Sequence, residues 1–440
     1  MSEPSPTADE SPPGHDPYAA LRVRDFRLYL GGNFISLVGM QMQTMAVSWQ
    51  IFQRTQSNYA VGMVGLVQVL PVISLALFAG HVADRMNRKY LVMMALLVVA
   101  AASVGLTVAD GLRDNWTSVL WMYGFLFVTG IARAFLQPGK QSLMPQLVPR
   151  DRFTSAITWN AGAFHLAAVM GPALSGGLIA ILGGATLAFV TDAVAALLFV
   201  GLLIGVRHER EELPPQALTW QGLLGGVNFV GKYPLILGAM TLDMFAVLLG
   251  GAVALFPYYS EKVLHVGATG LGWMQAAPAV GSVIMSFILS RRPPMERAGR
   301  NLIWSVAGFG LATIAFGLSH SLWFSLAMLF VTGALDTISV VVRHSLVLLH
   351  TPNAMRGRVS AINGMFISIS NELGGYESGT VAALFTPVIS VVSGGIGTLV
   401  VVAIAAWRVP ELRRYGRLDG GAPEPSSATI TSTEAESQGI

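Results

Sequence analysis

Long apolar stretches recur along this sequence, and each is long enough to cross the hydrocarbon layer of a membrane. A spanning helix needs about 20 mostly apolar residues. Only 12% of the residues are charged, whereas soluble domains contain about 25%. We therefore predict an all-α membrane protein with twelve transmembrane helices, at residues 28–52, 60–81, 91–109, 119–137, 155–181, 185–206, 235–258, 270–289, 302–318, 322–342, 359–385 and 388–407.

Basic residues gather in alternate connecting segments. With the amino terminus placed in the cytoplasm, the cytoplasmic segments hold 23 of the 27 lysines and arginines, Lys140 and Arg343 among them. Membrane proteins retain positive charge on their cytoplasmic side. We therefore expect both termini in the cytoplasm and an even number of spans.

The two halves of the sequence resemble each other at offsets of 203 and 207 residues. The aligned positions include 127–130 with 330–333, 175–176 with 378–379, and Gly65 with Gly272. Such a repeat predicts two pseudo-symmetric six-helix bundles related by an axis along the membrane normal. We accordingly divide the chain into a disordered cytoplasmic amino terminus (1–25), an amino-terminal half (26–206), a cytoplasmic linker with a surface helix (207–232), a carboxy-terminal half (233–408) and a disordered cytoplasmic carboxy terminus (409–440).

One loop carries a specific motif: residues 80–89 read Gly-His-Val-Ala-Asp-Arg-Met-Asn-Arg-Lys. This segment resembles the loop motif of the major facilitator superfamily, Gly-x-x-x-Asp-Arg-x-Gly-Arg-Lys, with an asparagine at the second glycine. The resemblance implies the major facilitator fold and a latch between the cytoplasmic ends of the two halves. The latch residues would be Gly80, Asp84, Arg85, Arg88 and Lys89. An acid can face a helix amino terminus there, and arginines can reach carboxylates or lipid phosphates. The alternative is an ordinary basic loop on the cytoplasmic side.

Charged residues also occur inside predicted spans, where each costs about 2.5 to 3.5 kcal/mol on insertion scales. Arg133 lies in a segment similar to the superfamily's fourth-helix motif, which is associated with proton-coupled transport, and the repeat pairs it with Asp336. Asp243 and Glu372 lie in the seventh and eleventh spans. The resemblance places Arg133, Asp243 and Asp336 on the wall of a central cavity. We expect these four residues to serve proton coupling, with static ion pairs between helices as the alternative.

Polar residues recur on one face of the first span, Asn33 and Gln43 among them. Together with Arg133 they are candidate substrate-binding residues, unless they form hydrogen bonds with neighbouring helices. Residues 171–177, Gly-Pro-Ala-Leu-Ser-Gly-Gly, resemble the glycine-proline motif of the superfamily's antiporters.

Enzymatic chemistry is not supported by the sequence. The chain has no cysteine and no His-Glu-x-x-His zinc motif, and the segment 226–232 lacks the Ser or Thr of a phosphate-binding loop. We expect no enzyme activity, no cofactor, no metal and no nucleic-acid partner. A receptor or scaffold that keeps the fold without transporting is the alternative from another class.

Several stretches narrow the resemblance further, including Thr-Pro-Asn-Ala-Met-Arg-Gly-Arg at 351–358 and Leu-Phe-Pro at 255–257. They resemble siderophore exporters of the enterobactin type, and the first also resembles related multidrug and macrolide exporters. The resemblance implies a monomeric secondary transporter in a bacterial inner membrane. It would export siderophore-like or amphipathic small molecules in exchange for protons, by alternating access. Multidrug or macrolide efflux is the alternative.

Overall fold

The computed structural model describes residues 16, 18–207, 228–293, 295–352 and 355–416, and within these it is helical with no strand. Short polar residues begin several helices: Ser57 accepts a hydrogen bond from the Ala60 amide, and Asp114 accepts one from the Thr117 amide. The long helices are α1 (Arg24–Thr55), α2 (Asn58–Arg85), α3 (Arg88–Asp110), α4 (Asn115–Leu143), α5 (Phe153–Leu182), α6 (Thr186–Ile204), α8 (Pro234–Gly250), α10 (Gly267–Ser290), α11 (Ala298–Gly317), α12 (Leu322–His350), α13 (Arg356–Leu384) and α14 (Pro387–Arg408).

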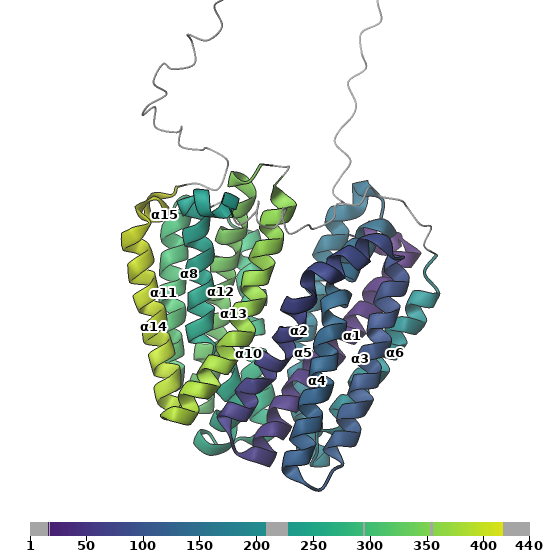
Figure 1. Ribbon diagram of the computed structural model, residues 1–440. Helices are drawn as coiled ribbons and strands as arrows, with labels where there is room; N and C mark the ends of the chain where they lie inside the picture. The colour runs from purple at the N-terminus through teal and green to yellow at the C-terminus, as the bar shows by residue number, and fades with distance from the viewer. Residues whose placement is uncertain (1–15, 17, 208–227, 294, 353–354, 417–440) are drawn as a thin grey trace, which may run out of the picture.

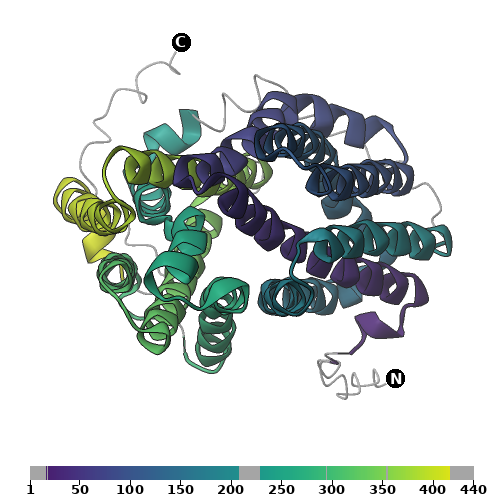
Figure 2. The ribbon, with the colours of Figure 1, turned by 90° about the horizontal axis from the view of Figure 1, so that it is seen from below.

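These helices form two bundles. α1 to α6 pack on one another as the amino-terminal half, and α8 to α14 pack as the carboxy-terminal half. Figure 2 shows the purple, blue and dark teal helices of the first half on one side and the lighter teal to yellow helices of the second on the other, with the two groups in contact between them. The described chain begins and ends at one end of the molecule, the upper end in Figure 1, which we call the terminal end. The opposite end is called the distal end.

Nine of the described helices are long and apolar enough to cross a membrane, by length and composition alone. They are α2, α3, α4, α5, α6, α8 with its continuation to Val263, α10, α12 and α14. The helices α1, α11 and α13 fall outside this set, although each was predicted as a span. α1 and α13 bury polar side chains, such as those of Gln43 and Ser378, which lower their apolar content.

The surface of the bundles is apolar where it would face lipid. Trp116, Trp323 and Trp407 are each at least 69% exposed, and each is the second or the second-to-last residue of its helix. Tryptophan is enriched at the two membrane interfaces, so these positions fit a multi-pass membrane protein.

Two helices extend further than the sequence predicted. α4 continues through Pro138 to Leu143, and α12 continues to His350. Lys140 and Arg343 therefore lie within helices and not in connecting segments, and Arg343 is only 2% exposed. The predicted ends of these two spans, at 137 and 342, were therefore too early. In α12 the buried acid Asp243 lets the helix keep a basic residue that hydropathy alone would exclude.

The predicted start of the first half, at residue 26, and the predicted end of the second half, at residue 408, lie close to the start of α1 and the end of α14. α1 begins at Arg24 after a single 3₁₀ turn, Ala20–Arg22, and a short helix, α15 (Pro410–Arg414), follows α14. The predicted disordered termini otherwise lie outside the described residues, as does most of the predicted linker, 208–227.

Glycines allow the two halves to approach closely at two helix crossings. Where α5 meets α10, a Cβ on Gly176 would lie 2.6 Å from the Ala268 carbonyl oxygen and 3.1 Å from Gly272 Cα. Where α2 meets α13, a Cβ on Gly62 would lie 2.8 Å from the Gly375 carbonyl oxygen, and 3.2 Å from Gly379 Cα. Only glycine fits such backbone contacts.

Further contacts between the halves lie at the distal end. Gln53, near the end of α1, donates a hydrogen bond to the Glu261 carboxylate. The rings of Phe52 and Tyr258 are 6.3 Å apart, and those of Tyr59 and Tyr376 are 6.0 Å apart. In Figure 1 the two bundles converge toward this end and splay toward the terminal end.

Candidate functional site

The strongest charge cluster lies inside the carboxy-terminal half. Asp243 of α8 and Arg343 of α12 form a buried ion pair, and the Ser339 hydroxyl donates to Asp243 at 3.4 Å. Both charged side chains are at most 5% exposed. Arg343 Nε has no hydrogen-bond partner among the described residues. A buried donor without a partner costs about 1 to 3 kcal/mol, so the cluster leaves bonding capacity unused.

Asp336 lies beside this pair and faces open space. Its carboxylate is acted on by the charges of Asp243 and Arg343, and within the described part of the chain it has no hydrogen bond or ion pair. It lines a cavity of about 220 Å³ together with residues of α8, α10, α11 and α13. His344, the next residue of α12, also interacts electrostatically with Asp243 and Arg343. With both acids ionised and His344 neutral, two carboxylates and one guanidinium leave one negative charge in excess. A proton or a cation would neutralise it.

Arg133 and Glu372 come together at the crossing of α2 with α13. Arg133 of α4 donates to the Gln68 side chain at 2.6 Å, and its charge is acted on by Glu372 and Asp192. Glu372 packs on α2, since a Cβ on Gly65 would lie 3.0 Å from its Oε2 atom. Arg133 and Glu372 belong to different halves, so this charge interaction spans the interface.

Arg133 and Asp336, which the repeat pairs, are thus kept apart. Arg133 bonds to Gln68 in the amino-terminal half, whereas Asp336 lies in the carboxy-terminal half, where the cation beside it and Asp243 is Arg343. A sequence repeat relates equivalent positions in the two bundles, and equivalent positions need not touch. The structure therefore separates the predicted residues into one cluster in the carboxy-terminal half and one at the interface.

The two candidate substrate residues of α1 are bonded to neighbouring helices. Asn33 donates to Asn160 of α5 at 2.9 Å, and Gln43 donates to Ser103 of α3 at 2.9 Å. Ser103 in turn donates to Asp192 of α6 at 2.6 Å. Gln43 and Asp192 are each 1% exposed, so this chain of hydrogen bonds joins three helices inside the amino-terminal half.

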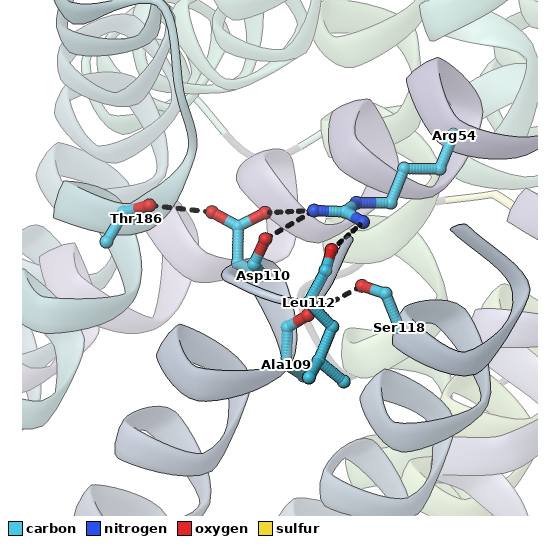
Figure 3. A network of polar contacts seen from close by, with 6 residues as sticks. All are labelled: Arg54, Ala109, Asp110, Leu112, Ser118 and Thr186. Carbon is cyan, nitrogen blue, oxygen red and sulfur yellow. Dashed lines mark hydrogen bonds and ion pairs between the residues drawn. The ribbon is translucent and has the colours of Figure 1, made fainter. Parts of the chain in front are cut away.

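A second network fastens the distal end of the same half (Figure 3). Arg54 at the end of α1 forms an ion pair with Asp110 at 3.3 Å and donates to the Leu112 carbonyl at 3.0 Å. Thr186, which begins α6, donates to the other Asp110 oxygen at 2.7 Å. The arginine also donates to the Asp110 carbonyl, one of the carbonyls left without helical partners at the end of α3.

The predicted latch is described in part. Gly80 is buried in α2, whereas the side chains of Asp84 and Arg85 lie outside the described residues. Lys89 donates to the carbonyls of Ile204 and Val206, at 3.2 and 2.8 Å, at the end of α6. A cation is favourable at a helix carboxy terminus, so Lys89 here stabilises its own half.

Arg343 was not among the predicted site residues, although its spacing from Asp336 in the sequence could have identified it. Arg343 follows Asp336 by seven residues, two helical turns, which places both on one face of α12. Because the predicted span ended at residue 342, Arg343 was assigned to a connecting segment and its place on the same helix face as Asp336 was overlooked. Within the described residues there is no group of three or more His, Cys, Asp or Glu side chains placed to hold a metal ion.

Comparisons with known proteins agree with this architecture. A family model described as transmembrane secretion effector matches residues 15–425. The enterobactin exporter EntS of Escherichia coli O1:K1 is 26% identical over 396 residues, which cover 89% of this chain and 93% of that protein. The same protein from Shigella boydii serotype 18 gives the same identity and coverage.

Solved transporter structures share the fold. A D-xylose–proton symporter superposes with a TM-score of 0.69 at 15% identity, covering 90% of this chain and 100% of that one. A bacterial homologue of the iron transporter ferroportin, in an inward-facing state, gives 0.69 at 15% identity, covering 90% and 99%. A bacterial homologue of the human lysosomal transporter Spinster, inward-facing and occupied, gives 0.66 at 16% identity, covering 91% and 98%.

The two bundles, the repeat that relates them and the match over residues 15–425 lead to one conclusion: the chain belongs to the transmembrane secretion effector family of the major facilitator superfamily of transporters.

Proposed function

We propose that this protein is a secondary active exporter that exchanges protons for amphipathic small molecules across a bacterial inner membrane, working as a monomer. The observation that carries the proposal is the carboxyl group of Asp336, which lies beside the Asp243–Arg343 pair, is open to a cavity and has no ion pair among the described residues. A carboxylate in such a place gains or loses a proton when its access changes sides. Proton exchange is then coupled to whichever helix motion changes that access.

Alternating access is supported by where the halves touch. The glycine crossings and the Gln53–Glu261 hydrogen bond close the distal end, while the bundles splay at the terminal end. We assign the terminal end to the cytoplasm, because the basic residues of the chain cluster there. In this assignment all twelve long helices cross the membrane, and the structure represents the state open to the cytoplasm. In the other state Glu372 would have to leave Arg133.

The proposed direction of transport and the proposed cargo are based on the relatives of this chain. The EntS proteins are named enterobactin exporters, and the match covers most of both chains, so we propose export of siderophore-like or amphipathic molecules. Multidrug efflux is the second candidate, and the largely apolar lining of the 220 Å³ cavity favours it.

The test is transport into everted membrane vesicles that contain the full chain. We expect uptake of an iron-free catecholate siderophore or of ethidium when the vesicle interior is made acidic, and loss of uptake when an uncoupler dissipates the gradient. Addition of the cargo should also release protons from the vesicles. Asp336→Asn should abolish the proton release, whereas Glu377→Gln, another acid in a long helix, should not. Uptake that is independent of the gradient, or unaltered in Asp336→Asn, would overturn the proposal.

A further inference from the structure

The cavity next to Asp336 has a defined position in the carboxy-terminal half. α8 ends at Gly250, and the chain continues through Gly251 into a 3₁₀ turn, Ala252–Leu255. Both glycines line the cavity, and Asn371 of α13, which is exposed, also contributes to its wall. The interruption matters because irregular backbone inside a membrane is tolerated where it is buried in protein or lines a cavity.

The charge of this cavity has one sign. Asp336 is the one ionisable side chain among its described lining residues, because α10, α11 and α13 contribute no titratable group to it. The nearby Asp243 and Arg343 compensate each other. The carboxy-terminal end of α8 adds partial negative charge from carbonyls that lack helical partners. An anion would therefore meet two sources of repulsion, whereas a cation would be attracted by both.

The walls are apolar and aromatic. Phe256 and Phe316 pack edge to face with ring centroids 5.5 Å apart, and Phe309 lies against the interruption of α8, 2.6 Å from where a Cβ on Gly250 would be. All three phenylalanines line the cavity. Aromatic faces attract cations, and most strongly where water is excluded.

The volume limits what can enter. The cavity has a volume of about 220 Å³. Pockets that hold a whole drug-sized molecule measure about 300 to 1,000 Å³. This cavity therefore accommodates one ring with its charged group and not a complete siderophore.

We propose that this cavity binds the aromatic, cationic end of the transported molecule, with the ammonium group at Asp336 and the ring against Phe309. The inference rests on the proposed export function and, among the cargoes proposed there, selects amphipathic organic cations over catecholate siderophores. A neutral apolar group would fill the space but would leave the Asp336 charge uncompensated. A catecholate or carboxylate would place a second negative charge beside it.

Equilibrium binding to the purified full chain tests this without any gradient. The probe is benzyltrimethylammonium, and the matched probes are 3,3-dimethylbutan-1-ol, which lacks both charge and ring, and phenylacetate, which reverses the charge. We expect saturable binding of the cation alone. Asp336→Asn should weaken binding about tenfold, because a quaternary ammonium has no N–H and is attracted to the carboxylate by its charge alone.

Variants of the wall and a control complete the design. Phe309→Leu keeps the wall apolar but removes the ring, and should weaken binding about two- to thirtyfold. Glu377→Gln should bind like the unaltered chain, because Glu377 does not line this cavity. Equal binding of phenylacetate, or full binding by a folded Asp336→Asn protein, would overturn the inference.

The two proposals fail in different ways. If the chain exports a catecholate in a gradient-dependent manner but does not bind benzyltrimethylammonium, the substrate class is wrong and the exporter stands. If the cation binds at Asp336 but no gradient drives uptake of any cargo, the site stands and the transport mechanism is wrong.

Discussion

The two halves share a fold and differ in how they use polar residues. In the amino-terminal half the buried acid Asp192 accepts from Ser103, and that serine accepts from Gln43. In the carboxy-terminal half Asp243 is paired with Arg343, while Asp336 beside them has no partner within the described part of the chain and faces a cavity. Similar backbones thus hold a hydrogen-bonded acid in one half and, in the other, an acid without a hydrogen bond among the described residues. Both halves leave some buried polar atoms unpaired in the part of the chain that the structure describes, among them Asn33 Oδ1 and Arg343 Nε.

The difference indicates a division of labour. A buried carboxylate that accepts a hydrogen bond from a neighbouring helix favours one arrangement of the helices around it. An excess charge next to a cavity instead permits two states, with and without a bound proton or cation. We infer that the amino-terminal half acts as the more rigid partner and that the carboxy-terminal half contains the groups that respond to ligands.

The largest expected effect separates the two buried acids in a transport assay. Asp336→Asn should eliminate proton release on cargo addition, because the amide cannot be deprotonated. Asp192→Asn should retain most of it, because the amide oxygen can still accept from Ser103. Proton release measured with a pH-sensitive dye in everted vesicles checks both variants. Equal losses in the two variants would remove the proposed division of labour.

The next effect concerns the two basic residues that the repeat aligns, Lys140 and Arg343. Arg343→Met leaves Asp243 buried without its partner and should destabilise the protein by about 3 to 5 kcal/mol. The Nζ atom of Lys140 lies 5.3 Å from the Phe199 ring centroid. Lys140→Met removes this cation–ring contact and should lower the stability of the protein by about 0.5 to 2 kcal/mol. Thermal unfolding in detergent measures both. Adding Asp243→Asn to Arg343→Met should restore part of the stability, and a further decrease would contradict the pairing.

The distal ends of the halves give a third comparison. Position 54 aligns with 261 at the offset of 207 residues, and next to it Tyr259 donates to the Gly317 carbonyl at 2.8 Å. Arg54→Met removes charged hydrogen bonds and should cost about 1.5 to 3 kcal/mol, whereas Tyr259→Phe removes one neutral bond and should cost about 1 kcal/mol. Amide hydrogen exchange at the carboxy-terminal ends of α3 and α11 shows where each variant loses stability. A larger loss of hydrogen-exchange protection in Tyr259→Phe than in Arg54→Met would contradict the expectation that the Arg54 network is the stronger of the two.

The smallest effect tests the contact that joins the halves. Gln53→Leu removes the hydrogen bond to Glu261 and should weaken distal closure by about 1 kcal/mol. Spin-label distances between the distal ends of α1 and α10 should then show a larger population of separated halves. Gln50→Leu is the matched control, because Gln50 lies one turn earlier in α1 and its side chain forms no hydrogen bond with the other described residues. An unchanged distance distribution in Gln53→Leu would exclude a gating role for this contact.

Part of this architecture could be derived from the sequence. The repeat aligns Gly65 with Gly272 and Gly176 with Gly379, and these four glycines lie at the two crossings between the halves. The repeat identifies both crossings because pseudo-symmetry relates the contact of α5 with α10 to the contact of α2 with α13. Apolar length likewise predicted most spans, and it was less informative for α1 and α13, whose polar residues are satisfied inside the bundle.

The partners of the charged residues depended on tertiary structure. The sequence supplied Arg133, Asp243, Asp336 and Glu372, but the pairing of Asp243 with Arg343 and the approach of Glu372 to Arg133 depend on how separate helices pack. Hydropathy excluded Arg343 from its helix because it scores each residue as if its charge were unpaired. By itself the sequence determined a membrane protein of two related halves, since periodicity and apolar length act locally along the chain. Only the packing of distant helices decided which charge is left over, because neutralisation is a property of positions in space.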